Sequence, residues 1–105
     1  MTKYLLDTNI LLRASDRNAL QHPLARDAIY QLLIQGNHCC LTLQVLVEFW
    51  GVATRPTDVN GFGWTPQRTM EQINQFLSRF IVLEENDKIL FEPNLIAKLG
   101  RTRRL

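Results

Sequence analysis

In the stretch YLLDTNILLR, residues 4–13, an apolar run stops at Asp7-Thr8-Asn9 and then resumes. A strand that is buried on both faces reads as continuous apolar sequence, and Lys3 to Asp7 fits such a strand. A carboxylate within such a run must be paired, bind a metal, or lie near water at the strand end. We therefore predict that the strand ends at Asp7 and that a loop or short helix follows.

Strands and helices are predicted to alternate along the rest of the chain. The predicted strands are Lys3 to Asp7, His38 to Leu43 and Ile81 to Leu83. The first three predicted helices run from His22-Pro23 to Gly36-Asn37, from Gln44 to Thr54, and from Thr65-Pro66 to the third strand. A last helix is predicted to start at Asn86-Asp87. This alternation favours an α/β fold with a parallel sheet flanked by helices on both faces. We expect the strand order third, second, first, because right-handed crossovers connect neighbouring parallel strands.

Two of the helices carry apolar stripes that we expect to be buried. The stripe of the helix from His22 consists of Leu24, Ala25, Ala28, Ile29, Leu32 and Leu33, and that of the helix from Thr65 consists of Met70, Ile73, Phe76, Leu77 and Phe80. Residues at these spacings share one side of a helix.

Length and composition indicate one globular domain over residues 1–105, since 46% of the residues are apolar and 21% are charged. We see no signal peptide and no apolar segment near the roughly 20 residues of a membrane span, so no membrane contact is expected. Cys39 and Cys40 are adjacent in the chain, so they are not expected to form a disulfide with each other. We predict that both are reduced residues in the core of a cytoplasmic protein. The net charge is +2, and the basic tail with Arg101, Arg103 and Arg104 is expected to be solvated and disordered, with contacts to phosphates as the alternative.

Asp7 is the first candidate functional residue. Ligands of parallel α/β sheets bind outside the carboxyl ends of the strands, and Asp7 stands at that end of the first strand. The alternative is purely structural, because Asp, Thr and Asn all cap a following helical turn well. Both interpretations stay open from the residues alone.

Glu48 is the second candidate, because it interrupts the apolar helix in LTLQVLVEFWGVATRP, residues 41–56. A glutamate on such a surface is normally paired or ligates something. It follows the second strand by one helical turn, which places it near the same edge as Asp7. The alternatives are an ion pair with a nearby arginine such as Arg55, or simple exposure to solvent.

Two converging carboxylates without a neighbouring histidine suit a hard cation, Mg²⁺ or Mn²⁺. His22 and His38 are isolated, and Cys39-Cys40 lacks the spacing of a zinc site. The chain has neither a glycine-rich phosphate loop nor a nucleophile elbow. Metal-assisted hydrolysis of a phosphodiester is the chemistry that remains.

The two motifs resemble those of the PIN-domain ribonucleases, and among them the VapC-type toxins of toxin–antitoxin pairs. YLLDTNILLR is similar to the opening motif of the family, and the stretch around Glu48 is similar to its second motif. The resemblance extends from about Lys3 to about Glu85. The resemblance implies a PIN-like three-layer fold and an endoribonuclease in which Asp7 and Glu48 bind Mg²⁺ or Mn²⁺ and are catalytic. It also implies that Thr8 and Asn9 orient Asp7, and that the partners are RNA, a cognate antitoxin and a second copy in a homodimer.

The sequence departs from the family pattern after the third strand. The family has further acids there, whereas this chain ends at EPNLIAKLGRTRRL, residues 92–105, about where the turn before them begins. Asp87 and Glu92 lie too early to match those acids. We therefore expect a C-terminally truncated PIN domain, without the last helix and strands and with an incomplete active site. The alternatives are a catalytically inactive remnant that only binds an antitoxin or a PIN partner, and an RNA-binding module without chemistry.

Overall fold

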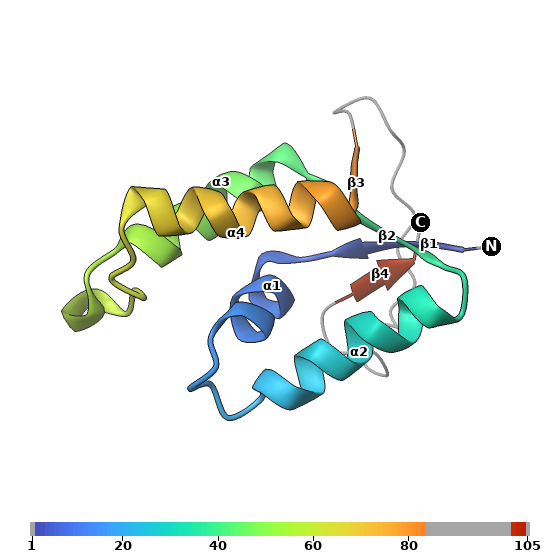
Figure 1. The fold of residues 1–105 in the computed structure, drawn as a ribbon, viewed down its shortest axis with the longest axis horizontal. Coiled ribbons are helices and arrows are strands. Elements are labelled where there is room, and N and C mark those ends of the chain that lie inside the picture. Colours follow the sequence, from blue (N-terminus) through green and yellow to red (C-terminus); the bar gives the residue numbers. More distant parts are fainter. Residues whose placement is uncertain (1, 84–101, 105) are drawn as a thin grey trace.

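The computed structural model describes residues 2–83 and 102–104 (Figure 1). Its elements are β1 (Lys3–Leu6), α1 (Thr8–Ser15), α2 (His22–Ile34), β2 (His38–Thr42), α3 (Leu43–Thr54), a 3₁₀ turn (Thr57–Val59), α4 (Pro66–Arg79), β3 (Ile81–Leu83) and β4 (Thr102–Arg104). The α/β class is confirmed. Among the described helices, none combines the length and the apolarity that crossing a lipid bilayer requires. The helix predicted from Asn86-Asp87 lies outside the described residues.

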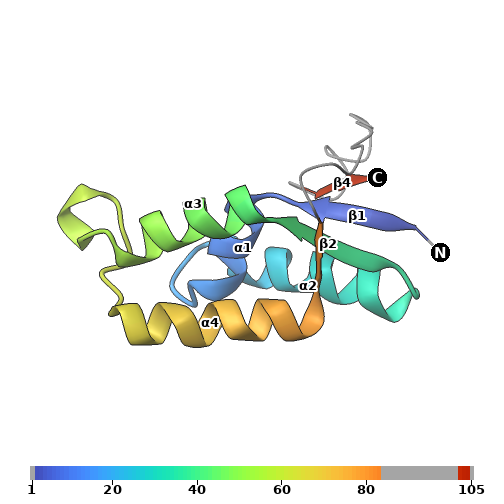
Figure 2. The same cartoon turned by 90° about the horizontal axis from the view of Figure 1, so that it is seen from above.

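The sheet has the order β3-β2-β1-β4, and its first three strands are parallel. The predicted order of the third, second and first strands is therefore confirmed. In the register, Leu5 lies beside Cys40, and Cys40 lies beside Ile81. Because the three strands run in the same direction, their carboxyl ends lie at one edge, and α1 and α3 begin at that edge (Figure 2).

The fourth strand corrects the expectation of a disordered basic tail and of a sheet with three strands. Residues 102–104 pair antiparallel with β1, with Thr102 beside Leu6 and Arg104 beside Tyr4. A three-residue strand of polar and basic residues has no apolar alternation, which is the main signal of a strand in a sequence. Its backbone nevertheless completes the hydrogen bonds of the β1 edge.

Local sequence signals fix the ends of the helices. The Thr65 hydroxyl accepts a hydrogen bond from the Arg68 N–H, and Pro66 occupies the first helical position of α4, as predicted. After α2, Gly36 adopts a positive φ of 81°, and the N–H groups of Gly36 and Asn37 donate to the carbonyls of Leu33 and Leu32. This pattern is a Schellman motif, which ends the helix and turns the chain into β2.

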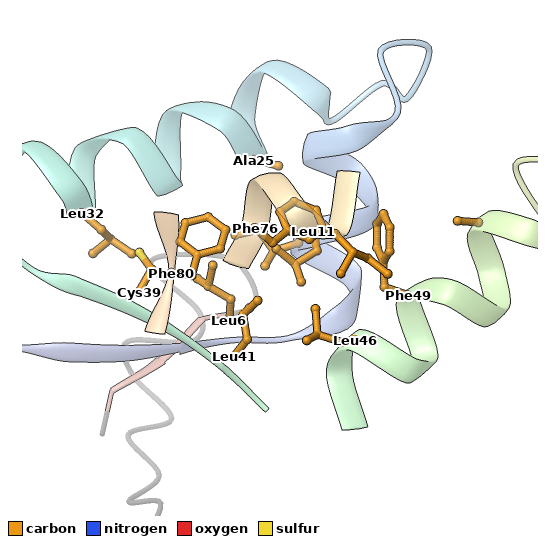
Figure 3. Close-up of a cluster of buried hydrophobic side chains, with 13 residues drawn as sticks. Leu6, Leu11, Ala25, Leu32, Cys39, Leu41, Leu46, Phe49, Phe76 and Phe80 are labelled. Atoms are coloured by element: carbon orange, nitrogen blue, oxygen red, sulfur yellow. The ribbon is translucent and has the colours of Figure 1, made fainter. Parts of the chain in front are cut away.

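The main core lies on one face of the sheet, and all four described helices contribute to it, so the expectation of helices on both faces is not met within the described residues (Figure 3). Leu6 of β1 and Cys39 and Leu41 of β2 point toward the helices (Figure 3). Over them pack the following buried side chains of the four helices and the turn into β3: Ile10, Leu11, Ala25, Leu32, Leu46, Phe49, Ala53, Ile73, Phe76 and Phe80. Leu5 and Cys40 alternate with these strand residues and are buried as well.

The two predicted apolar stripes are too wide. In α4, Met70 and Leu77 are 43% and 45% exposed, while the polar Thr69 is fully buried and donates its hydroxyl to the Thr65 carbonyl. In α2, Leu24 is 69% exposed, and Leu33 also lies at the surface. Successive helical residues are rotated by about 100°, so a neighbour of a buried residue readily falls outside the contact.

The Cys39 thiol is one source of pH dependence in this core. Burial, reinforced by the neighbouring Cys40, raises the pKa of Cys39 from 9.0 to about 12. The unfolded chain releases the Cys39 thiol proton near pH 9, whereas the folded chain keeps it. The contribution of Cys39 to the free energy of unfolding is therefore complete below pH 9 and is lost as the pH rises toward 12. We expect the free energy of unfolding to fall by about 1.4 kcal/mol per pH unit in that window, measured by urea denaturation.

The Cys39→Ala variant removes the thiol and so isolates its contribution to the pH dependence. The quantity to compare is the slope of the free energy of unfolding against pH, because the substitution also changes the absolute stability. The variant should lose less stability than the wild type between pH 9 and pH 11. Equal slopes for the two proteins would contradict the assignment to Cys39.

Candidate metal centre

Asp7 lies directly after β1 and is the N-cap of α1. Its backbone is extended, with φ −93° and ψ 171°, and its Oδ1 accepts a hydrogen bond from the Ile10 N–H at 3.2 Å. The strand-end prediction and the capping alternative therefore both describe this residue. Among the described residues, Oδ2 has no hydrogen-bond partner, so one carboxylate oxygen remains available for a ligand.

Glu48 lies in the second turn of α3, which starts immediately after β2. Thr42 is the N-cap of this helix, since its hydroxyl accepts a hydrogen bond from the Val45 N–H. The Glu48 side chain is exposed, and both of its oxygens accept hydrogen bonds: Oε2 from the Thr8 hydroxyl at 2.6 Å and Oε1 from the Gln44 side-chain amide at 3.2 Å. The buried side of α3 carries Leu46, Phe49 and Ala53 instead.

The Thr8–Glu48 hydrogen bond joins the two sequence motifs across 40 positions of the chain. Thr8 follows Asp7 directly, so Glu48 lies at the same edge of the sheet as Asp7, as the register of α3 predicted. Within the described residues, Glu48 pairs with Thr8 and Gln44 and forms no ion pair with Arg55. The ion-pair alternative is therefore not observed, whereas the alternative of exposure to solvent describes Glu48, whose side chain is exposed.

The hydrogen bonds around Asp7 differ from those that the resemblance implied. Thr8 holds Glu48, whereas the resemblance implied that it orients Asp7. Asn9 is exposed, and in the described part of the chain no hydrogen bond joins it to Asp7. Gln44 was missed as a site residue. Its signal in the sequence is its spacing of four from Glu48, which places the two side chains on the same side of a helix.

The oxygen ligands at this edge of the sheet suit a hard divalent cation, but they are few. Asp7 and Glu48 offer carboxylate oxygens, the ligands that Mg²⁺ and Mn²⁺ prefer. Residues 2–83 and 102–104 contain no group of three or more His, Cys, Asp or Glu side chains that could hold a metal ion. The described residues therefore supply two acids and no third, and a cation there would keep most of its water ligands.

Comparisons with known proteins add no identity to this geometry. No protein-family model matches the chain, and a search of curated proteins gives no match. The fold is that of an α/β protein, and the Thr8–Glu48 hydrogen bond places Glu48 at the carboxyl edge of the parallel sheet, where Asp7 follows β1.

Proposed function

We propose that this chain carries part of the metal site of a PIN-type endoribonuclease, of the kind found in VapC toxins. The observation that supports the proposal is the hydrogen bond between Thr8 and Glu48, which brings the second acidic motif to the strand end where Asp7 stands. RNA is the proposed substrate, and Mg²⁺ or Mn²⁺ is the proposed cofactor.

The residues of the chain have separate tasks in this proposal. Asp7 and Glu48 bind the cation, and the Thr8 hydroxyl and the Gln44 amide orient the Glu48 carboxylate. When bound, the cation lowers the pKa of a water molecule and neutralises charge on the phosphodiester. The cap at Ile10 fixes the Asp7 carboxylate relative to α1. Two acids hold a cation more weakly than the larger acidic cluster of the family, so we propose that the catalytic site is incomplete.

A second candidate is a protein that binds an antitoxin without turnover. A cleft of about 440 Å³ lies between α1, α2 and α4 and favours this candidate. Arg17, Arg26 and Arg79 line it beside Tyr30 and Leu33, and in the described part of the chain these arginines form no ion pair. A cleft with this character suits an acidic, amphipathic segment of an antitoxin. Both candidates place the protein in the cytoplasm, where the buried thiols of the core stay reduced.

Cation binding tests the proposed metal site directly. We expect purified protein to bind Mn²⁺ in the millimolar range, and Asp7→Asn and Glu48→Gln each to weaken binding about tenfold, because each removes one charged ligand. Asn is also a good N-cap, so Asp7→Asn preserves the start of α1. The readout is the electron paramagnetic resonance signal of free Mn²⁺ during a titration.

Glu71→Gln is the matched control, because Glu71 is an exposed glutamate on α4, a helix that carries neither Asp7 nor Glu48. Its affinity for Mn²⁺ should equal that of the wild type. The same loss of binding in all three variants would mean that Mn²⁺ responds to overall charge, and the proposed site would be wrong.

A further inference from the structure

A second cleft, of about 480 Å³, lies between the end of α1 and the segment that connects α3 to α4. In Figures 1 and 2 both segments lie at the end of the molecule away from β1. Arg17 and Arg68 line this cleft together with Trp64 and Asn18, and its one acid is Asp16. The Asp16 carboxylate already accepts a hydrogen bond from the Asn18 N–H. The cleft therefore presents an excess of positive charge beside aromatic surface.

Arg68 is held in place by Trp64. Its guanidinium carbon lies 4.2 Å from the centre of the Trp64 ring. Trp64 is in turn packed against Phe49 and Phe62, with ring centres 6.2 Å and 5.1 Å away. A guanidinium stacked in this way keeps the edge of its donor fork free, and that fork matches the oxygens of a phosphate. Within the described part of the chain, neither Arg17 nor Arg68 forms an ion pair.

The connecting segment is rigid enough to define the cleft wall. The N–H groups of Phe62 and Trp64 donate to the carbonyls of Val52 and Ala53 at the end of α3. Gly61 lies so close to Arg55 that a Cβ atom there would be 1.9 Å from the Arg55 carbonyl oxygen. The aromatic wall is therefore fixed to the helix that carries Glu48.

Ser15 lines both this cleft and the first one. Its hydroxyl oxygen is buried, and in the part of the chain that the structure describes it has no hydrogen-bond partner. An oxygen without exposed surface does not reach a ligand in the cleft, so the case for a ligand rests on the two arginines and the aromatic residues.

We propose that this cleft binds a phosphate of single-stranded RNA, with Arg17 and Arg68 as its ligands and the aromatic wall beside the adjoining base. This inference rests on the proposed function, since it supplies the ribonuclease with a subsite outside the metal centre. Helix α1 connects the two places: Asp7 caps its start, and Ser15 ends it about 12 Å further on. A short stretch of single-stranded RNA spans that separation. Arginines beside aromatic rings are the usual components of single-strand binding.

The test is binding of a fluorescent single-stranded RNA in EDTA, measured by anisotropy at several salt concentrations. Without a divalent cation the metal centre does not contribute. Arg17→Ala and Arg68→Lys should each weaken binding about fivefold, and Arg17→Ala should lower the slope of log K against log salt by about 0.7, the value for one lost phosphate contact on a single strand. Arg17 is exposed, so its replacement leaves the core intact.

Lys3→Ala is the matched control, because it removes the same charge from an exposed position on β1, outside the cleft. It should leave both the affinity and the salt slope unchanged. Wild-type affinity in the two arginine variants, an equal loss in Lys3→Ala, or no binding of RNA in EDTA would each overturn the proposal. Cleavage is not needed for this readout, so an inactive metal centre with intact binding would contradict only the ribonuclease function.

Discussion

Purified protein supplied with Mg²⁺ or Mn²⁺ should cleave single-stranded RNA about a hundredfold more slowly than a PIN-type ribonuclease with its full set of acids. The reason is the small number of acids: Asp7 and Glu48 lie at one edge of the sheet, and the described residues contain no group of three or more possible metal ligands. Carboxylates in such a site both hold the cation and offset its charge. A cation held by two of them leaves the attacking water poorly positioned, and small errors of position cost about a hundredfold in rate.

The slow reaction should depend on both acids. Asp7→Asn keeps the cap of α1 and removes the charge, so it separates loss of the cation from loss of the fold, which Asp7→Ala does not. We expect Asp7→Asn and Glu48→Gln to reduce cleavage to the level seen in EDTA, measured on a labelled RNA. Fast cleavage that Asp7→Asn abolishes would show that two acids suffice, and cleavage that survives Asp7→Asn would place the activity elsewhere.

Replacing Phe49 by alanine should destabilise the protein by about 3–5 kcal/mol. Phe49 is 0% exposed, and its ring packs edge-on against Phe76 at 5.1 Å and against Trp64 at 6.2 Å between centres. The variant loses the buried area of the ring and both aromatic contacts, and it leaves a cavity where α3, α4 and their connecting segment meet. The free energy of unfolding of a small domain is about 5–15 kcal/mol, so the substitution removes a large part of it.

Val47→Ala is the control for this substitution, because Val47 lies on the same helix and is 63% exposed. Its free energy of unfolding in urea should change by less than about 0.5 kcal/mol. If Phe49→Ala cost no more than Val47→Ala, the aromatic cluster would not be the centre of the core that its packing indicates.

Local signals in the sequence determined much of this fold. The change from apolar to polar residues at Asp7 ended β1, because a carboxylate cannot stay inside a buried strand. Thr65-Pro66 and Gly36-Asn37 set the boundaries of α4 and α2 through short-range hydrogen bonds and restricted backbone angles. The alternation of strands and helices then predicted the parallel sheet and its order. These signals act over a few residues, so they can be read without knowing the tertiary structure.

The long-range contacts were decided only by the tertiary structure. The sequence predicted that Glu48 and Asp7 share an edge, but not that Thr8 would supply the hydrogen bond between the two motifs. The short strand β4 has no pattern of its own and exists through its pairing with β1.

The exposure of Met70 and the gathering of Arg17 and Arg68 around one cleft also depend on how the helices pack. Periodicity identifies the side of a helix that faces the core to within about one residue. Which neighbouring side chains are covered is set by the shape of the partner surface, and only packing fixes that shape.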